Sequence, residues 1–230
     1  MIQSYIEEQE MKTELYIDND AKEELPLIVL NTFEEAGQRT FDLLKERGQK
    51  DFLLLCISDL NWNDDLSPWY LDPIFKKEPP FAGKADQYLE VLLQKILPEK
   101  EEYITSVLHK KITYCALTGY SLAGLFALYA ATKTSRFKRV VSASGSLWFP
   151  GFSDYLIEHG ISENIDRVYL SLGDKEALTR HELMSQVKTE TLKTYEYLKD
   201  RIDCIFEENE GNHFKDEDLR VCKGIEYILK

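Results

Sequence analysis

A serine stands where one apolar run gives way, without a spacer, to another. In the stretch LTGYSLAGLFALYAA (117–131), Ser121 has small residues two positions away on each side, Gly119 and Ala123. The run before it is typical of a buried strand and the run after it of a helix. A sharp turn between strand and helix holds a serine hydroxyl clear of the backbone. Ser121 is therefore the candidate nucleophile.

A serine hydroxyl is a weak nucleophile that needs an adjacent base, and the base needs an orienting acid. His213 lies in EGNHF, directly after the last expected strand, and is the candidate base. The acid is expected in the loop GDKE, which offers Asp174 and Glu176. Asp174 lies nearer to the end of the preceding strand, so the residues alone leave both carboxylates open.

An acyl-transfer site also needs N–H donors aimed at the oxyanion that develops during attack. Leu122 opens the expected helix after the nucleophile, so its backbone N–H is the expected first donor. The second donor is expected from the loop after the first buried strand, where Thr32 or Phe33 can supply a backbone N–H.

These residues must be positioned by alternating strands and helices. Strands are expected at 13–19 (antiparallel), 26–30, 51–57, 111–119, 137–146, 166–173 and 202–211, and helices at 34–48, 84–104, 121–135, 152–160, 178–201 and 216–230. Pro98 predicts a kink or break in the second helix. This alternation predicts a single α/β domain over residues 1–230, with a mostly parallel sheet covered by helices on both faces. Loops at the carboxyl ends of the strands then carry the candidate residues.

Aromatic residues cluster on the same loops. Trp62 and Trp69 lie in one long loop, Trp148 follows the fourth buried strand, and Tyr120 adjoins the nucleophile. They predict the walls of a hydrophobic acyl or aryl pocket, although Trp62 and Trp69 can instead pin the loop to the core. The segment 149–165 is short, which predicts an open site without a large lid.

The composition excludes several classes of partner. A formal net charge of −13 over 230 residues argues against nucleic acid and against an anionic membrane surface. No apolar run is long enough for a membrane span, and the acidic N-terminal stretch is unlike a secretion signal. The cysteines show no CxxC pair and are expected to be reduced and buried: Cys56, Cys115, Cys204 and Cys222. We expect a cytoplasmic protein with a small-molecule partner and neither metal nor organic cofactor, and its oligomeric state stays open.

Four motifs together resemble one family. GYSLAGLFALYA, SASGSLWFPGF, YLSLGDKEALTRHELM and EGNHF are similar to the putative esterase family of α/β-hydrolases, which includes esterase D-like and siderophore esterases. The resemblance covers roughly residues 25–230 and implies an α/β-hydrolase fold with Ser121 as nucleophile and His213 as base. It favours Glu176 over Asp174, because siderophore esterases commonly carry Glu at the third position after this glycine. Ala123 departs mildly from the usual glycine.

The sequence thus predicts a serine esterase that hydrolyses a soluble carboxylic ester. A siderophore-type lactone is one substrate that the resemblance implies. An acyltransferase or thioesterase that uses the same three residues is the first alternative. A hydrolase fold retained as a non-catalytic binding module is the second.

Overall fold

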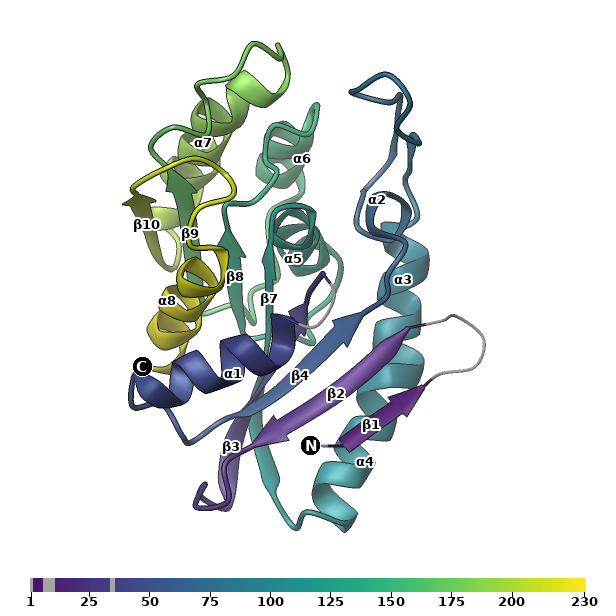
Figure 1. The fold of residues 1–230 in the computed structure, drawn as a ribbon, viewed down its shortest axis with the longest axis vertical. Helices are drawn as coiled ribbons and strands as arrows, with labels where there is room; N and C mark the ends of the chain where they lie inside the picture. Colours follow the sequence, from purple (N-terminus) through teal and green to yellow (C-terminus); the bar gives the residue numbers. More distant parts are fainter. Residues whose placement is uncertain (1, 6–10, 34–35) are drawn as a thin grey trace.

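The structure is a computed structural model that describes residues 2–5, 11–33 and 36–230 (Figure 1). A central sheet contains eight strands. They are β1 (Ile2–Tyr5), β2 (Lys12–Ile17), β3 (Glu24–Asn31), β4 (Leu53–Ser58), β7 (Lys111–Tyr120), β8 (Arg139–Ala143), β9 (Arg167–Gly173) and β10 (Asp203–Asn209).

The strand order in the sheet is β1-β2-β4-β3-β7-β8-β9-β10. β2 runs antiparallel to both of its neighbours, and every other neighbouring pair is parallel. The expected mostly parallel sheet is therefore confirmed. β3, β7 and β8 lie in its middle, so the loops that follow these strands converge at one edge of the sheet.

Helices cover both faces of the sheet, as predicted. They are α1 (Ala36–Glu46), α2 (Trp62–Asp65), α3 (Ala85–Val91), α4 (Leu97–Ser106), α5 (Leu122–Lys133), α6 (Phe152–His159), α7 (Val187–Lys199) and α8 (Glu217–Leu229). Figure 1 shows α1 and α8 together on one face, with α3 to α7 on the other. Residues 34–35, which the sequence assigns to the start of the first helix, lie outside the described residues.

Alternation along the central strands fills a core on each side of the sheet. In β3, Leu27 and Val29 join the core beneath α3 to α7, and Ile28 and Leu30 join the core beneath α1 and α8. All four side chains are almost completely buried. Successive strand residues point to opposite faces, so a continuous apolar run is what a doubly covered strand requires.

The helix predicted at 84–104 is disturbed just before Pro98. A π-helical turn, Leu92–Ile96, separates α3 from α4, and Pro98 lies in the first turn of α4. Proline has no N–H to donate, so the first turn of a new helix tolerates it. The chain stays helical over residues 85–106, so no break occurs at Pro98, and the irregularity is this π-helical turn.

The helix predicted at 178–201 begins later than expected. α7 starts at Val187, after a short 3-10 turn at Met184–Gln186. Ahead of it, the Thr179 hydroxyl accepts the His181 N–H, and His181 Nε2 bonds the carbonyl of Ile74. Side-chain bonds of this kind compete with helical hydrogen bonds and keep the segment in a turn.

The N-terminal edge and the long loop hold more structure than predicted. One antiparallel strand is expected before residue 25, but two form, β1 and β2. The loop after β4 contains α2 and a small antiparallel pair, β5 (Tyr70–Leu71) and β6 (Phe81–Ala82). Between β8 and β9 the chain forms only the eight-residue α6. No helix in the described part of the chain has the length and apolar character that crossing a membrane requires.

Candidate active site

Ser121 sits between β7 and α5 in a strained conformation. Its φ of 58° and ψ of −123° lie outside the regions that non-glycine residues favour. The backbone around it holds this geometry, since the Ser121 N–H donates to the Ala143 carbonyl at 3.2 Å and its carbonyl accepts the Ser146 N–H at 3.0 Å. Strain that neighbouring structure maintains is typical of functional positions.

Small residues flank the serine because the turn brings the strand against the first helical turn. A Cβ atom on Gly119 would lie 2.3–2.5 Å from atoms of Ala123. A Cβ atom on Gly124 would be 3.0 Å from the Ser142 hydroxyl. Small volume at these positions is therefore a packing requirement of the turn itself.

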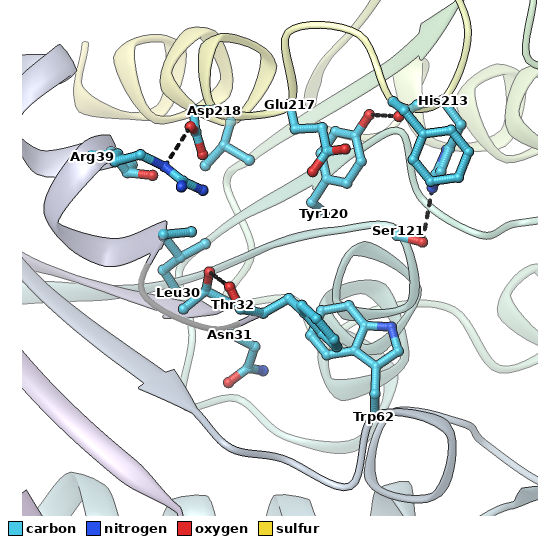
Figure 2. A pocket seen from close by; sticks show the side chains of 15 residues that line it. Leu30, Asn31, Thr32, Arg39, Trp62, Tyr120, Ser121, His213, Glu217 and Asp218 are labelled. Carbon is cyan, nitrogen blue, oxygen red and sulfur yellow. Dashed lines mark hydrogen bonds and ion pairs between the residues drawn. The ribbon is translucent and has the colours of Figure 1, made fainter.

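Ser121, His213 and Glu176 form a continuous hydrogen-bonded chain. His213 Nε2 lies 3.0 Å from Ser121 Oγ, and His213 Nδ1 lies 2.7 Å from Glu176 Oε2. Figure 2 shows the first of these bonds at the edge of a cavity. The His213 side chain is 25% exposed and that of Glu176 only 3%. Such a chain can move the serine proton onto the imidazole while the carboxylate stabilises the resulting imidazolium.

The structure places Glu176, and not Asp174, against His213. Asp174 is exposed, and its Oδ1 accepts the backbone N–H of Gly211 at 2.6 Å. The Asp174 N–H in turn donates to the Asn209 carbonyl. Asp174 therefore fastens its loop to the loop that carries His213, while the carboxylate of Glu176 faces the imidazole.

A buried guanidinium, which the sequence analysis missed, joins the two loops. Arg220 is 1% exposed, and its Nη1 donates to Glu176 Oε1 at 2.7 Å and to the Ser144 hydroxyl at 2.9 Å. Its Nη2 donates to the carbonyls of Glu210 and Asn212, which lie just before His213. Arg220 thus holds the carboxylate and the histidine loop at the same time.

One sequence signal points to this arginine. The buried face of α8 consists otherwise of apolar or small residues: Val221, Cys222, Gly224, Ile225 and Ile228. A charged residue on the apolar face of a helix requires a buried partner. The partner itself, Glu176, lies on a distant loop, so the sequence does not reveal it.

Burial and hydrogen bonding act in opposite directions on Glu176. Burial raises the pKa of the carboxyl, but the hydrogen bond and charge of His213 lower it, as does the N–H of Gly173. The balance puts the pKa of Glu176 below its ordinary value. Glu176 is thereby held as the carboxylate, the form that accepts a hydrogen bond from imidazole.

The structure supports an available N–H at Leu122 for the first oxyanion donor and separates the two alternatives for the second. Leu122 is the first residue of α5, where an N–H has no carbonyl one turn earlier in the helix. Thr32 and Phe33 are the two alternatives for the second donor. Thr32 is the wrong one, because its N–H donates to the Ile57 carbonyl at 3.0 Å and extends the sheet. Phe33, the next residue, lines the cavity beside Ser121, and no acceptor among the described residues takes its N–H.

Two cavities meet at the serine. The larger has a volume of about 400 Å³ and lies under α1 and α8, and the smaller has about 180 Å³ and extends toward Trp148 and Met184. Ser121, His213 and Trp62 line both. An ester bond placed at Ser121 can therefore direct one substituent into each cavity.

Three of the four aromatic residues expected around the site line these cavities. Tyr120 and Trp62 line the larger cavity, and Trp148 lines the smaller. Trp69 lines neither cavity, so the pocket role is wrong for Trp69 and the alternative given for it, packing of the loop on the core, is the one observed. Its ring lies 5.8 Å from that of Phe149 and 5.6 Å from that of Tyr155, and it pins the long loop to the core.

A second serine, also missed in the sequence, adjoins Ser121. Ser146 is 2% exposed, lines the smaller cavity, and its Oγ lies 3.3 Å from Ser121 Oγ. Its hydroxyl can therefore reach a group bound at Ser121.

Among the residues with described placement, no three His, Cys, Asp or Glu side chains converge as metal ligands. All four cysteines are buried.

A family model described as Putative esterase matches residues 8–210. Uncharacterized protein YbbA of Bacillus subtilis (strain 168) is 22% identical over 181 residues, which are 76% of this chain and 72% of that protein.

Two solved structures share the fold. Siderophore hydrolase EstA from Aspergillus nidulans superposes with a TM-score of 0.76 at 17% identity, over 99% of this chain and 92% of that one. An IroE-like serine hydrolase from Shewanella oneidensis does so with a TM-score of 0.75 at 17% identity, over 95% and 75%. At these identities the likeness shows the α/β-hydrolase fold alone.

The lowered pKa of Glu176 predicts a pH-dependent contribution to stability. Because the folded-state pKa lies below the unfolded value of 4.5, the contribution is fully present above that pH and is lost as the pH falls through the folded value. Glu176→Gln should lower the free energy of unfolding by about 2 kcal/mol near neutrality. This deficit should shrink as the pH falls below 4.5. Urea denaturation at stepwise lower pH measures it. A deficit that stays constant or grows below pH 4.5 would contradict the prediction.

Proposed function

Because the chain belongs to the Putative esterase family, we propose that it is a serine-dependent carboxylic ester hydrolase with Ser121, His213 and Glu176 as its catalytic residues. The observation that carries this proposal is the hydrogen-bonded chain that ends at Ser121 Oγ, at the junction of two cavities. An ester bound at Ser121 therefore meets the nucleophile and the base already in position, and Glu176 already holds the imidazole.

In the acylation step, Ser121 Oγ attacks the ester carbonyl carbon while His213 Nε2 accepts the hydroxyl proton. The Glu176 carboxylate stabilises the imidazolium through Nδ1–H. The tetrahedral intermediate then breaks its bond to the alcohol oxygen, which leaves with the proton from His213. The products of this step are the free alcohol and an acyl group on Ser121.

Deacylation repeats these two steps with water as the nucleophile. His213 takes a proton from a water molecule as the water oxygen attacks the acyl carbon, and the proton then passes to Ser121 Oγ as the acyl–oxygen bond breaks. The acid product leaves and the hydroxyl is restored. We assign the Leu122 and Phe33 N–H groups to the oxyanion in both steps, because the Thr32 N–H is engaged in the sheet.

The two cavities support a small ester substrate with a substituent on each side of the ester bond. Within that class, a siderophore-type lactone is a narrower candidate, supported by the fold that the chain shares with a siderophore hydrolase. The net charge of −13 weighs against a strongly anionic form of such a substrate.

Hydrolysis of p-nitrophenyl esters tests the proposal. Ser121→Ala should lower kcat/KM by at least about a thousandfold, because no other group replaces the nucleophile. Ser135→Ala, at an exposed serine in the loop after α5, is the matched control and should retain wild-type turnover. Equal turnover by wild type and Ser121→Ala would exclude Ser121 as the nucleophile.

A second pair of variants tests which carboxylate acts as the acid. Glu176→Gln should lower kcat/KM about a thousandfold, since an amide cannot stabilise the imidazolium. Asp174→Asn should stay within about threefold of wild type, because the amide oxygen can still accept the Gly211 N–H. The kcat/KM values of both variants, measured with one ester, show which carboxylate acts on His213. A larger loss in Asp174→Asn than in Glu176→Gln would transfer the role to Asp174.

A further inference from the structure

We propose that the larger cavity selects esters that carry an organic cation, an ammonium or quaternary ammonium group, with Glu217 as its counter-charge. The inference rests on the proposed function, because it places the ester bond at Ser121 and the cationic substituent in this cavity. Its evidence is the combination of charge and aromatic surface in the cavity wall.

The fixed charges of the wall leave one carboxylate available. Arg39, Glu217 and Asp218 line the cavity, and Arg39 Nε donates to Asp218 Oδ2 at 3.1 Å. The Asp218 carboxylate thereby offsets the charge of Arg39. No cationic side chain among the described residues lies within ion-pair distance of the Glu217 carboxylate. The wall therefore carries a net negative charge at Glu217.

Aromatic rings supply the remainder of the wall near the serine. Phe33, Trp62, Tyr120 and Phe214 all line the cavity, and the Phe33 and Trp62 rings meet edge to face at 5.5 Å. Phe33 is 64% exposed and Phe214 79% exposed, although both are large apolar side chains. Aromatic faces attract organic cations, and quaternary ammonium groups are commonly bound by such rings together with a carboxylate.

Tyr120 contributes a ring and not a charge. Its hydroxyl donates to the His213 carbonyl, which turns the polar end of the side chain toward the histidine loop. Burial raises the pKa of Tyr120 to about 12, and the nearby carboxylates of Glu176 and Glu217 add to the rise. The phenol therefore stays neutral.

Figure 2 shows how these groups surround the cavity. Glu217 and Tyr120 project into it from one side and Trp62 from the opposite side. Ser121 lies at one end, and the Arg39–Asp218 pair lies away from it at the other. A cation joined by a short chain to an ester bond at Ser121 would thus lie between the aromatic rings and the Glu217 carboxylate.

An anionic substituent fits this wall less well. Asp218 already offsets the charge of Arg39, and the Glu217 carboxylate would repel a bound anion. The formal net charge of −13 adds a field that attracts cations and repels anions. The cavity therefore favours a cation over an anion of the same size.

Matched ester pairs test the inference. One pair is acetylcholine and its neutral isostere, in which a tert-butyl group replaces trimethylammonium. The other is the p-nitrophenyl ester of trimethylammonio-butanoic acid and its tert-butyl isostere, which puts the cation on the acyl side. In at least one pair, the wild type should favour the cationic ester by about tenfold in kcat/KM. Added salt should weaken this preference.

The variants isolate Glu217. Glu217→Gln should reduce the cationic preference at least about threefold while hydrolysis of the neutral isostere continues. Asp216→Asn is the matched control: it removes the neighbouring negative charge, which lies outside the cavity lining and makes no side-chain capping bond. Asparagine also tolerates the left-handed conformation of residue 216. This control should keep the wild-type preference.

The outcomes separate this inference from the proposed function. Hydrolysis of neutral and cationic esters at equal rates in both pairs, or a preference that Glu217→Gln leaves unchanged, overturns the inference and leaves the esterase standing. If no ester is hydrolysed, the proposed function fails. Calorimetric binding of phenyltrimethylammonium then tests the cation site by itself. Binding that Glu217→Gln weakens at least about threefold supports the site, and absent or unchanged binding overturns it.

Discussion

The candidate site depends on the hydrogen bonds that the buried guanidinium of Arg220 donates to two neighbouring loops. A charge with 1% exposure must be neutralised and hydrogen-bonded, because a buried charge without partners is strongly unfavourable. Its partners are the Glu176 carboxylate and two carbonyls of the loop before His213. The loops after β9 and β10 are therefore drawn together around one side chain of α8. The imidazole that they hold then faces the serine at the end of β7.

Local signals explain what could be predicted from the sequence. The continuous apolar runs identify strands covered on both faces, and the sheet is mostly parallel as they predict. The turn at Ser121 is readable because Gly119 and Ala123 touch within one short segment. His213 directly follows the last strand, so its place at the sheet edge follows from the fold. In each case the pattern and its structural cause lie within a few neighbouring residues.

Features that depend on distant partners could not be predicted in this way. Nothing in the sequence near Thr32 indicates a partner for its N–H, but Ile57 of β4 supplies a carbonyl acceptor in the sheet. Trp69 lies in the same loop as Trp62, and only packing against α6 and the preceding turn separates their roles. Asp174 and Glu176 are two residues apart, and the fold alone decides which of them faces His213.

The proposed hydrolysis depends on activation of Ser121 by His213, and peptide mass spectrometry after reaction with a fluorophosphonate measures this activation. The reagent forms a stable covalent bond only with an activated serine, so the modified residue identifies the nucleophile. We predict a single adduct on Ser121 that forms at least about a hundredfold more slowly in His213→Ala. An adduct on Ser146 in place of Ser121 would make Ser146 the nucleophile, and labelling of Ser121 that His213→Ala leaves unchanged would exclude His213 as its base.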